Sequence, residues 1–400
     1  MLEVHEAQQR ILAEVSPLDA RECPLDASLG HVLAEDVVSD LGLPLWDNSA
    51  MDGYAVRSAD VANATREHPI RLRVVEHIGA GDTPKKAIPA GSAARIFTGA
   101  PVPAGADAIV MQEDTDQGAE TVSVFDGVKP GENIRRAGED IRRGETVLPA
   151  GAVVAPTHLS LLATLGRARV RVVRPPRVAV LATGEELVAV DQPLSPGKLR
   201  EGNSHLLAAF VRQLGAEPVR LGIARDDRAD LRAKLSEGLK YDALITSGGV
   251  SVGEHDLVKS VLEELGCAVK FWKVSVKPGK PFVFSRSKSC LVFGLPGNPV
   301  STMVTFLLFV RPALLKMAGR RDLDLPRRSA VATTEFRNHG GRRHFMRGVL
   351  TEKAGRLEVA SAGRQESHVL GSMVRANCLV DVAPDTVVKV GTEVDVRLFA

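Results

Sequence analysis

Charged residues and glycine-rich turns follow several apolar runs in the middle of this 400-residue chain. Buried strands are predicted for the apolar runs 178–182, 218–223, 243–246, 269–276 and 290–293. The segments that follow these runs are, in chain order, Thr183 to Glu186, Arg225 to Asp227, Ser247 to Asp256, Lys277 to Lys280 and Leu295 to Pro299. Ligands of a parallel α/β sheet bind beyond the carboxyl ends of its strands. We therefore expect these segments to form one site.

The residue types in these segments indicate an anion site. Glycine-rich turns that open helices expose backbone N–H groups, and helix N termini favour anions. Lys273, Lys277 and Lys280 add positive charge. Carboxylates, water and phosphate oxygens are the ligands that Mg²⁺ prefers. The expected ligand is a phosphate ester bound together with Mg²⁺.

Each of these segments, taken alone, has a simpler structural explanation. Residues 247–249 can be only a tight turn, Asp226 and Asp227 can be only helix N-caps, and 277–280 can be only a surface turn. Their predicted position on one sheet edge is what favours a binding site. Neither the P-loop pattern GxxxxGK[ST] nor a GxGxxG after the first strand occurs in the chain.

Two other groups of residues are open to two interpretations. The polar segment 46–55 contains one of the two Trp and one of the two Tyr residues, and it is either a binding segment or a structural turn. Arg342, Arg343 and Arg347 form either a clamp for an oxyanion or a solvated face.

The pattern of apolar residues predicts the elements that must position these groups. Strands alternate with helices from 177 to 317, which predicts a doubly wound α/β domain. Its helices are expected at 203–214, with Asn203 and Ser204 as N-caps, and at 229–240, 254–265 and 300–317. An amphipathic helix is expected at 4–15. Short strands on both sides of the α/β domain predict smaller β domains.

The predicted fold class is therefore α/β and multidomain: a doubly wound parallel α/β domain, small β domains, and a mixed helical and β linker domain. The predicted domains are 1–42 with 139–173 (mixed helix and strand), 43–138 (small β), 174–320 (doubly wound α/β, substrate-binding) and 321–400 (C-terminal β-barrel).

The overall composition argues against several classes of protein. Lys and Arg number 51 and Asp and Glu 49, and a net charge of only +2 argues against a nucleic-acid-binding protein. The polar segment 1–10 does not look like a signal peptide, and the apolar run 304–310 is too short to span a bilayer. Four separate cysteines without a CxxC fit a reducing compartment. We expect a cytoplasmic protein that binds neither nucleic acid nor membrane.

Five motifs, in order along the chain, resemble the molybdopterin molybdenumtransferase family, also called MoeA, which includes the gephyrin E domain. The motifs are Asp47 to Ala55 (DNSAMDGYA), Phe97 to Pro101 (FTGAP), Thr246 to Glu254 (TSGGVSVGE), Lys277 to Pro281 (KPGKP) and Leu295 to Pro299 (LPGNP). The resemblance implies an enzyme that inserts molybdate into adenylylated molybdopterin and releases AMP. It also implies a cytoplasmic four-domain homodimer, a requirement for Mg²⁺, and a separate molybdopterin adenylyltransferase protein that supplies the substrate.

The resemblance also suggests roles for individual residues. The implied catalytic residues are Asp52, Thr98, Glu186, Asp227, Asp256, Lys273 and Lys277. Of these, Asp52 and Thr98 would reach the cleft from the other subunit. The carboxylates expected to hold Mg²⁺ are Glu186, Asp227 and Asp256. The expected substrate-binding residues are Ser247, Gly248, Gly249, Ser251, Lys280, Pro296, Pro299, Arg343 and Ser367, the last two near the molybdate pocket.

Two residues depart from the family pattern, and one alternative function stays open. His344 stands where the family often has Glu, and Glu366 stands where Gly is common. The alternative is a dimeric scaffold, as gephyrin also is, that binds a partner peptide in a groove between subunits. A scaffold without catalysis should have lost acids or lysines at the strand ends. This chain retains them, which favours the enzyme.

Overall fold

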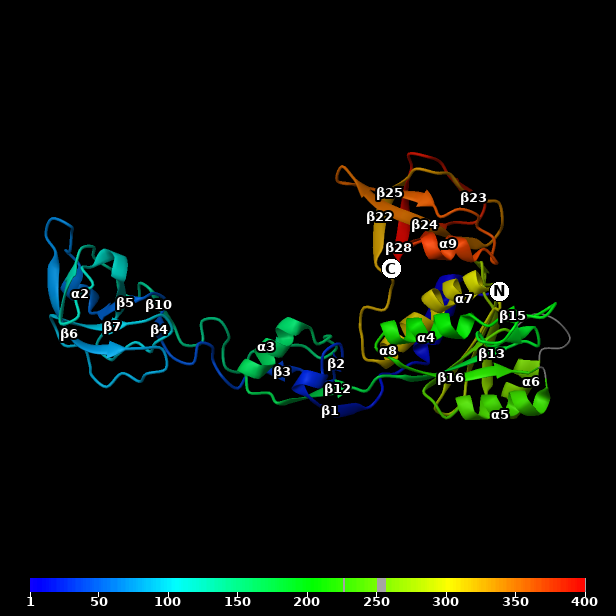
Figure 1. Cartoon of the computed structure of the whole chain (residues 1–400), viewed down its shortest axis with the longest axis horizontal. Helices are drawn as coiled ribbons and strands as arrows, with labels where there is room; N and C mark the ends of the chain where they lie inside the picture. The colour runs from blue at the N-terminus through cyan, green and yellow to red at the C-terminus, as the bar shows by residue number, and fades with distance from the viewer. Residues whose placement is uncertain (226, 250–256, 400) are drawn as a thin grey trace. The chain divides into compact units, whose positions relative to one another are not determined.

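The computed structural model describes residues 1–225, 227–249 and 257–399 (Figure 1). The chain forms two compact units. Unit 1 comprises Met1–Glu35, Ala150–Leu159 and Ala168–Ala400, and unit 2 comprises Asp36–Pro149 and Ser160–Arg167. The four-domain division expected from the sequence stays a prediction, because contacts within the chain separate only these two units.

A six-stranded sheet forms the centre of unit 1. Its strands are, in order across the sheet, β16 (Glu217–Ala224), β13 (Arg177–Thr183), β17 (Ala243–Ser247), β21 (Leu291–Leu295), β20 (Pro281–Arg286) and β18 (Ala268–Lys273). The first four strands are parallel, whereas β20 runs antiparallel to both of its neighbours. Strands β17 and β21 are buried along their whole length, as expected where helices cover both faces of a sheet.

Helices cover both faces of this sheet, so the predicted doubly wound arrangement is confirmed. Helices α5 (Arg228–Gly238) and α6 (Leu257–Glu264) pack on one face. Helix α4 (Asn203–Gln213) packs on the opposite face together with α1 (Val4–Ala13) and the long helix that ends at Met317 (Figure 1). All of these helices lie where the apolar periodicity predicts them.

The strand predicted at 269–276 is divided in the structure, and that prediction is wrong in this respect. Strand β18 ends at Lys273, and Val276–Lys277 form β19, which pairs with β24 (Arg343–Lys353) of the C-terminal barrel. The chain then returns as β20, a strand that the sequence did not predict. An apolar run shows that a segment is buried, but it does not show which sheet the segment joins.

The long helix at the centre of unit 1 consists of α7 (Pro299–Thr305), a π-helical segment η3 (Phe306–Val310) and α8 (Arg311–Met317). Over Pro299–Met317 it has 19 residues and is, by length and composition alone, long and apolar enough to cross a membrane. In the folded domain, 89% of its most apolar window is buried. Burial of this kind is what the core helix of an α/β domain requires.

The N-terminal segment joins the same core. Val4, Ala7 and Ile11 of α1 are buried against the α/β core, although the sequence suggested that residues 1–42 belong to a mixed linker domain. The other elements of this part of unit 1 are β1 (Ala20–Pro24), η1 (Leu25–Ala27), β2 (Val32–Leu33) and β12 (Arg169–Val173). Strands β1, β12 and β2 form a three-stranded antiparallel sheet.

The C-terminal segment forms the predicted β-barrel. The strands of its closed ring are, in order, β24, β25 (Arg356–Ser361), β22 (Arg327–Ala332), β28 (Glu393–Leu398) and β26 (Cys378–Val382), and β26 pairs back with β24. Strand β19 is added beside β24. The remaining elements of this region are β23 (Phe336–Asn338), α9 (Leu370–Arg375) and β27 (Thr386–Val388). Because β19 belongs to the barrel, the lysine-containing turn that follows it is held between the barrel and the α/β sheet.

Unit 2 is built around a five-stranded sheet. Its strands are, in order, β8 (Ala108–Met111), β5 (Gly53–Val56), β7 (Ser92–Ile96), β6 (Ile70–Ile78) and β9 (Thr121–Val124). Shorter elements are β3 (Val37–Val38), β4 (Asn48–Ser49), α2 (Ser58–Val61), η2 (Gln112–Asp114), β10 (Ile134–Arg135) and β11 (Thr146–Leu148), while α3 (Pro156–Thr164) begins in unit 1 and ends in unit 2. Most of the secondary structure of unit 2 is β-strand, and the bounds 43–138 expected for a small β domain stay a prediction.

Candidate functional site

The glycine-rich turn after β17 packs closely against the end of β13. Gly248 has φ +93°, and a Cβ atom there would lie 2.4 Å from the backbone O of Thr183. Gly249 has φ +66°, and a Cβ atom there would lie 2.9 Å from Thr183 Oγ1. Both positions therefore require glycine for local packing, and the turn lies at the carboxyl ends of two adjacent strands, as predicted.

Asn203 connects this turn with the next one. Its Nδ2 donates hydrogen bonds to Ser247 Oγ (2.8 Å) and to Gly297 O (2.7 Å). Asn203 is the first residue of α4, and Gly297 lies two residues before the start of α7. The N termini of two helices therefore meet beside Ser247, and the positive ends of both helix dipoles favour an anion there.

The role of Asn203 differs from the one that the sequence suggested. The N-cap position of α4 is occupied by Gly202, which makes no side-chain cap hydrogen bond. The buried carboxylate of Glu201 instead accepts hydrogen bonds from Ser204 N and Ser204 Oγ, each 2.6 Å. Because Glu201 accepts the hydrogen bonds from Ser204 in the first turn of α4, the side-chain amide of Asn203 is available to bridge the turn after β17 and the loop before α7. A polar residue at the start of a helix is usually interpreted as an N-cap, so the sequence alone did not predict that Asn203 bridges two loops.

The two described carboxylates of the predicted magnesium site follow neighbouring strands. Glu186 follows β13, and its Oε2 would lie 2.5 Å from a Cβ atom on Gly184. Asp227 follows β16 and is the N-cap of α5, where its Oδ2 accepts a hydrogen bond from Asp230 N (2.9 Å). The N-cap explanation therefore applies to Asp227, which leaves its second oxygen available. Ser251 and Asp256 lie outside the described residues, as does Asp226.

The donor chemistry of this edge fits Mg²⁺. Within residues 1–225, 227–249 and 257–399, no group of three His, Cys, Asp or Glu side chains could hold a metal ion. Mg²⁺ is usually bound by one or two carboxylates together with substrate phosphates and water. Glu186 and Asp227 supply donors of that type, and the requirement for Mg²⁺ stays a prediction.

The LPGNP loop positions three further predicted residues. Pro296 O accepts hydrogen bonds from Thr302 Oγ1 (2.6 Å) and Ser247 Oγ (3.5 Å), which ties the loop to the turn after β17. Pro299 is the first residue of α7. Ser367 Oγ accepts a hydrogen bond from Asn298 Nδ2 (3.2 Å), so the loop of the barrel that contains Ser367 lies at the N terminus of α7.

The three predicted lysines surround the reversal between β18 and β20. Lys273 pairs with Pro281 in the sheet, Lys280 O accepts a hydrogen bond from Val274 N (3.2 Å), and Lys277 lies opposite His344 in the β19–β24 pair. All three are exposed, and in the described part of the chain none has an acidic partner within ion-pair distance. The structure thus brings together three cations that are available to an anion.

The arginine cluster of the barrel is neither a solvated face nor a single clamp. Arg343 Nη1 pairs with Asp381 Oδ1 (2.7 Å), and Arg397 Nη2 contacts the other oxygen of the same carboxylate (2.7 Å). Arg342 Nη1 donates to Val276 O (3.1 Å). The head group of Arg343 is therefore already engaged, which favours a structural role over the oxyanion contact predicted for it.

Arg347, the third member of the cluster, is completely buried. Its Nη2 donates to Arg364 O and Glu366 O, both 3.1 Å, and its Nε donates to Ser372 Oγ (3.1 Å). Burial lowers the pKa of its guanidinium to about 10. Arg347 therefore holds the loop that contains Ser367, a role that an exposed-looking Arg-rich sequence does not reveal.

Asp52 and Thr98 lie together in unit 2. Asp52 Oδ1 accepts hydrogen bonds from Thr98 N (2.8 Å) and Thr98 Oγ1 (3.0 Å). These hydrogen bonds, the one from the backbone N–H first, hold the pKa of the Asp52 carboxyl below its ordinary value. The exposed side chains of Met51 and Phe97 belong to the same two motifs, and exposed Trp46 directly precedes the first of them. The pair is therefore a preformed, ionised carboxylate on the surface of unit 2.

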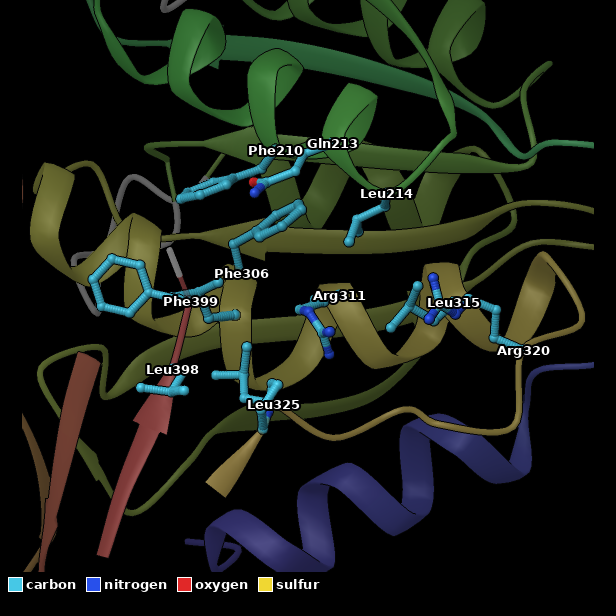
Figure 2. Close-up of a pocket in the computed structure, with 12 residues that line it drawn as sticks. Phe210, Gln213, Leu214, Phe306, Arg311, Leu315, Arg320, Leu325, Leu398 and Phe399 are labelled. Carbon is cyan, nitrogen blue, oxygen red and sulfur yellow. The ribbon is translucent and has the colours of Figure 1, made fainter. Parts of the chain in front are cut away.

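A separate hollow lies on the α4 face of unit 1 and contains none of the predicted site residues. It has a volume of about 340 Å³, and Figure 2 shows Phe210 and Phe306 stacked on its wall with Arg311 and Arg320 nearby. Arg311 Nη1 donates to Leu323 O (2.8 Å), and Arg320 pairs with Asp322 (2.7 Å). Its charged groups are therefore used within the fold.

Family models match almost the whole chain. The MoeA N-terminal region (domain I and II) matches residues 2–166, a probable molybdopterin binding domain matches 179–316, and the MoeA C-terminal region (domain IV) matches 329–399. The second of these models covers most of the α/β sheet and the helices that pack on it.

Curated relatives and solved structures are similar over nearly their full length. The molybdopterin molybdenumtransferase of Haemophilus influenzae is 39% identical over 385 residues, which cover 95% of this chain and 94% of the relative. Molybdopterin molybdenumtransferase 2 of Mycobacterium tuberculosis is 42% identical over 400 residues, covering 97% of both. A crystal structure of the molybdopterin biosynthesis MoeA protein from Pyrococcus horikoshii superposes with a TM-score of 0.86 at 30% identity, covering 100% of both chains.

Proposed function

The chain belongs to the MoeA family, and on this premise we propose that it is a molybdopterin molybdenumtransferase that inserts molybdate into adenylylated molybdopterin and releases AMP. The names of its relatives support a role in molybdenum cofactor biosynthesis. The adenylylated substrate and the release of AMP are the finer part of the proposal.

The observation that carries the proposal is the meeting of two helix N termini at the glycine-rich turn. Asn203 joins the start of α4 to the turn after β17 and to the loop before α7. An anion held there lies near the positive ends of two helix dipoles, and the side-chain amide of Asn203 is beside it. A phosphate of the adenylylated pterin has the charge and the oxygen acceptors that this arrangement favours.

The remaining charged residues have separate proposed roles in binding the substrates and the metal ion. Lys273, Lys277 and Lys280 attract the molybdate dianion and the charged pterin by charge-assisted hydrogen bonds. The carboxylates of Glu186 and Asp227, with Asp256, would hold Mg²⁺. When bound, Mg²⁺ stabilises negative charge on the phosphate that is cleaved. Asp52 and Thr98 of a second subunit would complete the site of a cytoplasmic homodimer, which receives its substrate from a separate adenylyltransferase protein.

The experiment that tests the proposal is release of AMP. The purified protein is incubated with adenylylated molybdopterin and Mg²⁺, with and without molybdate, and AMP is measured by chromatography. We expect AMP release that depends on molybdate and on Mg²⁺. Equal AMP release with and without molybdate, or none under either condition, would contradict the proposal. A scaffold without catalysis predicts the second of these results.

A further inference from the structure

A pocket of about 590 Å³ lies on the C-terminal barrel beside β19. Its lining includes Lys277 of β19, His344 of β24, Glu335 and Arg337 at the start of β23, and Arg364 and Glu366 of the loop after β25. All of these residues belong to unit 1, so the pocket does not depend on how the two units are placed.

His344 is the residue of this pocket whose polar side chain has no hydrogen-bond partner in the described part of the fold. It is only 3% exposed, and neither Nδ1 nor Nε2 has a hydrogen-bond partner among the described residues. Burying a polar group without a partner is unfavourable, so such a group is retained where a ligand or water supplies the partner. His344 lines the pocket, and neither of its ring nitrogens is used for a hydrogen bond within the described part of the fold.

The charges around His344 determine what that occupant is. The charged groups that face the ring are Lys277, Arg342 and Arg347, all cations. Burial, and to a smaller extent these cations, lowers the pKa of His344 to about 3, so the imidazole is neutral and has one N–H donor. A neutral ring leaves the positive charge of its neighbours undiminished, whereas a carboxylate at the same place would neutralise part of it.

The other charged residues of the pocket are paired with one another. Glu335 contacts Arg337, and Glu366 Oε1 accepts from Arg364 Nη2 (2.8 Å). Lys277 has no such acidic partner in the described part of the chain. The groups free to bind an occupant are therefore the Lys277 ammonium and the His344 imidazole, and both can donate a hydrogen bond to an oxyanion.

We propose that His344 is a specificity-determining residue for the oxyanion substrate: its neutral imidazole donates a hydrogen bond to a tetrahedral dianion that Lys277 holds in the barrel pocket. This inference rests on the proposed function, because it identifies the oxyanion as the molybdate of that reaction. The test therefore measures binding and turnover separately.

Binding of labelled molybdate to the full-length protein, without pterin, is measured by equilibrium dialysis. We expect His344→Leu to weaken binding about tenfold, since one buried hydrogen bond to an anion is lost. His344→Gln should restore most of the affinity, because its amide can donate from the same place. Leu350→Met, on the same strand but outside the pocket, is the matched control and should bind like the unchanged protein.

Several results would overturn the inference. If the unchanged protein and His344→Leu bind molybdate equally well, His344 does not contact the oxyanion. The same conclusion follows if His344→Leu and His344→Gln bind molybdate equally well. Stronger binding of inorganic phosphate than of molybdate would assign the pocket to a phosphate group. Circular dichroism of each variant checks that the barrel is folded.

Failure of the inference and failure of the proposed function are distinguishable. If the unchanged protein releases AMP in response to molybdate but His344→Leu has the same molybdate dependence, only the role of His344 is contradicted. If the unchanged protein binds molybdate with the expected dependence on His344 but releases no AMP, only the proposed reaction is contradicted.

Discussion

The Asn203 side chain shows how much of the candidate site depends on single hydrogen bonds. One amide nitrogen holds the turn after β17 and the loop before α7 together. An aspartate has nearly the same shape but cannot donate from this position, and it adds a negative charge where two helix N termini favour an anion.

We predict that Asn203→Asp lowers kcat/KM for AMP release at least about tenfold and weakens AMP binding by a similar factor, which corresponds to about 1.4 kcal/mol. AMP binding is measured by calorimetry. Gln213→Glu makes the same chemical change at the other end of α4 and should leave both quantities unchanged. Normal AMP binding by Asn203→Asp would exclude an anion from this part of the site.

The buried imidazole of His344 predicts a pH dependence of stability. Its pKa is about 3 in the folded protein and about 6.5 when exposed, so between these values the unfolded chain binds a proton that the folded chain does not. Stability therefore falls as pH decreases from about 7 towards 3.

We expect the free energy of unfolding to fall by about 2 kcal/mol more in the unchanged protein than in His344→Gln between pH 7 and pH 5. Urea unfolding of both proteins at the two pH values measures this difference. Any effect of the substitution on the free energy of unfolding that is the same at both pH values cancels in this comparison. The same pH dependence in both would show that His344 is protonated in the fold.

Among the structural elements, the reversal between β18 and β20 determines where the lysines lie. Gly279 has φ +111°, and a Cβ atom there would lie 2.4 Å from Thr305 Cγ2 of α7. The turn therefore packs directly on the long central helix. Both the backbone conformation and the lack of space require glycine.

We predict that Gly279→Ala destabilises unit 1 by about 1–3 kcal/mol. Thr305→Ser removes Cγ2 but keeps a hydroxyl for the hydrogen bond to Ser301 O (2.7 Å), so it should recover part of that loss in the double variant. Gly197→Ala, at φ +78° with nothing within 4 Å, measures the backbone strain alone. Thermal unfolding compares the variants. If Gly279→Ala destabilises the protein no more than Gly197→Ala does, the contact with α7 does not constrain the turn.

At the scale of the whole molecule, the predicted functional residues are divided between the two units. Asp52 and Thr98 belong to unit 2, while the carboxylates, lysines and glycine-rich turn belong to unit 1. The proposed homodimer would combine unit 2 of one subunit with unit 1 of the other, which makes each active site composite.

We predict that mixing inactive Asp52→Ala chains with inactive Asp227→Asn chains restores about a quarter of the activity, because half of the dimers are mixed and each has one intact site of two. Asparagine keeps an oxygen for the Asp230 N–H, so the α5 cap is retained. AMP release is measured after the subunits have exchanged.

Mixing Asp52→Ala with Thr98→Val, both in unit 2, is the control and should restore nothing, because every site then has one defect. Mixed dimers of Asp52→Ala and Asp227→Asn that stay inactive would place Asp52 in the site of its own chain.

The sequence by itself determined the local elements and the chemistry of the loops. The strands predicted at 178–182 and 243–246 agree with β13 and β17 to within one residue at each end, because a buried strand is a short apolar run between turn residues. The motifs also indicated the family, which the relatives confirm over the whole chain. These features depend on residues that are close together in the sequence.

Only the tertiary structure decided which distant segments meet. The division of 268–277 between a sheet and a barrel, the antiparallel strand β20 and the bridge made by Asn203 each depend on pairing across many residues. The same holds for His344, which is buried among cations that come from β19 and from its own strand. Polarity and periodicity describe one segment at a time, whereas burial, hydrogen-bond partners and pKa values depend on the segments packed against it.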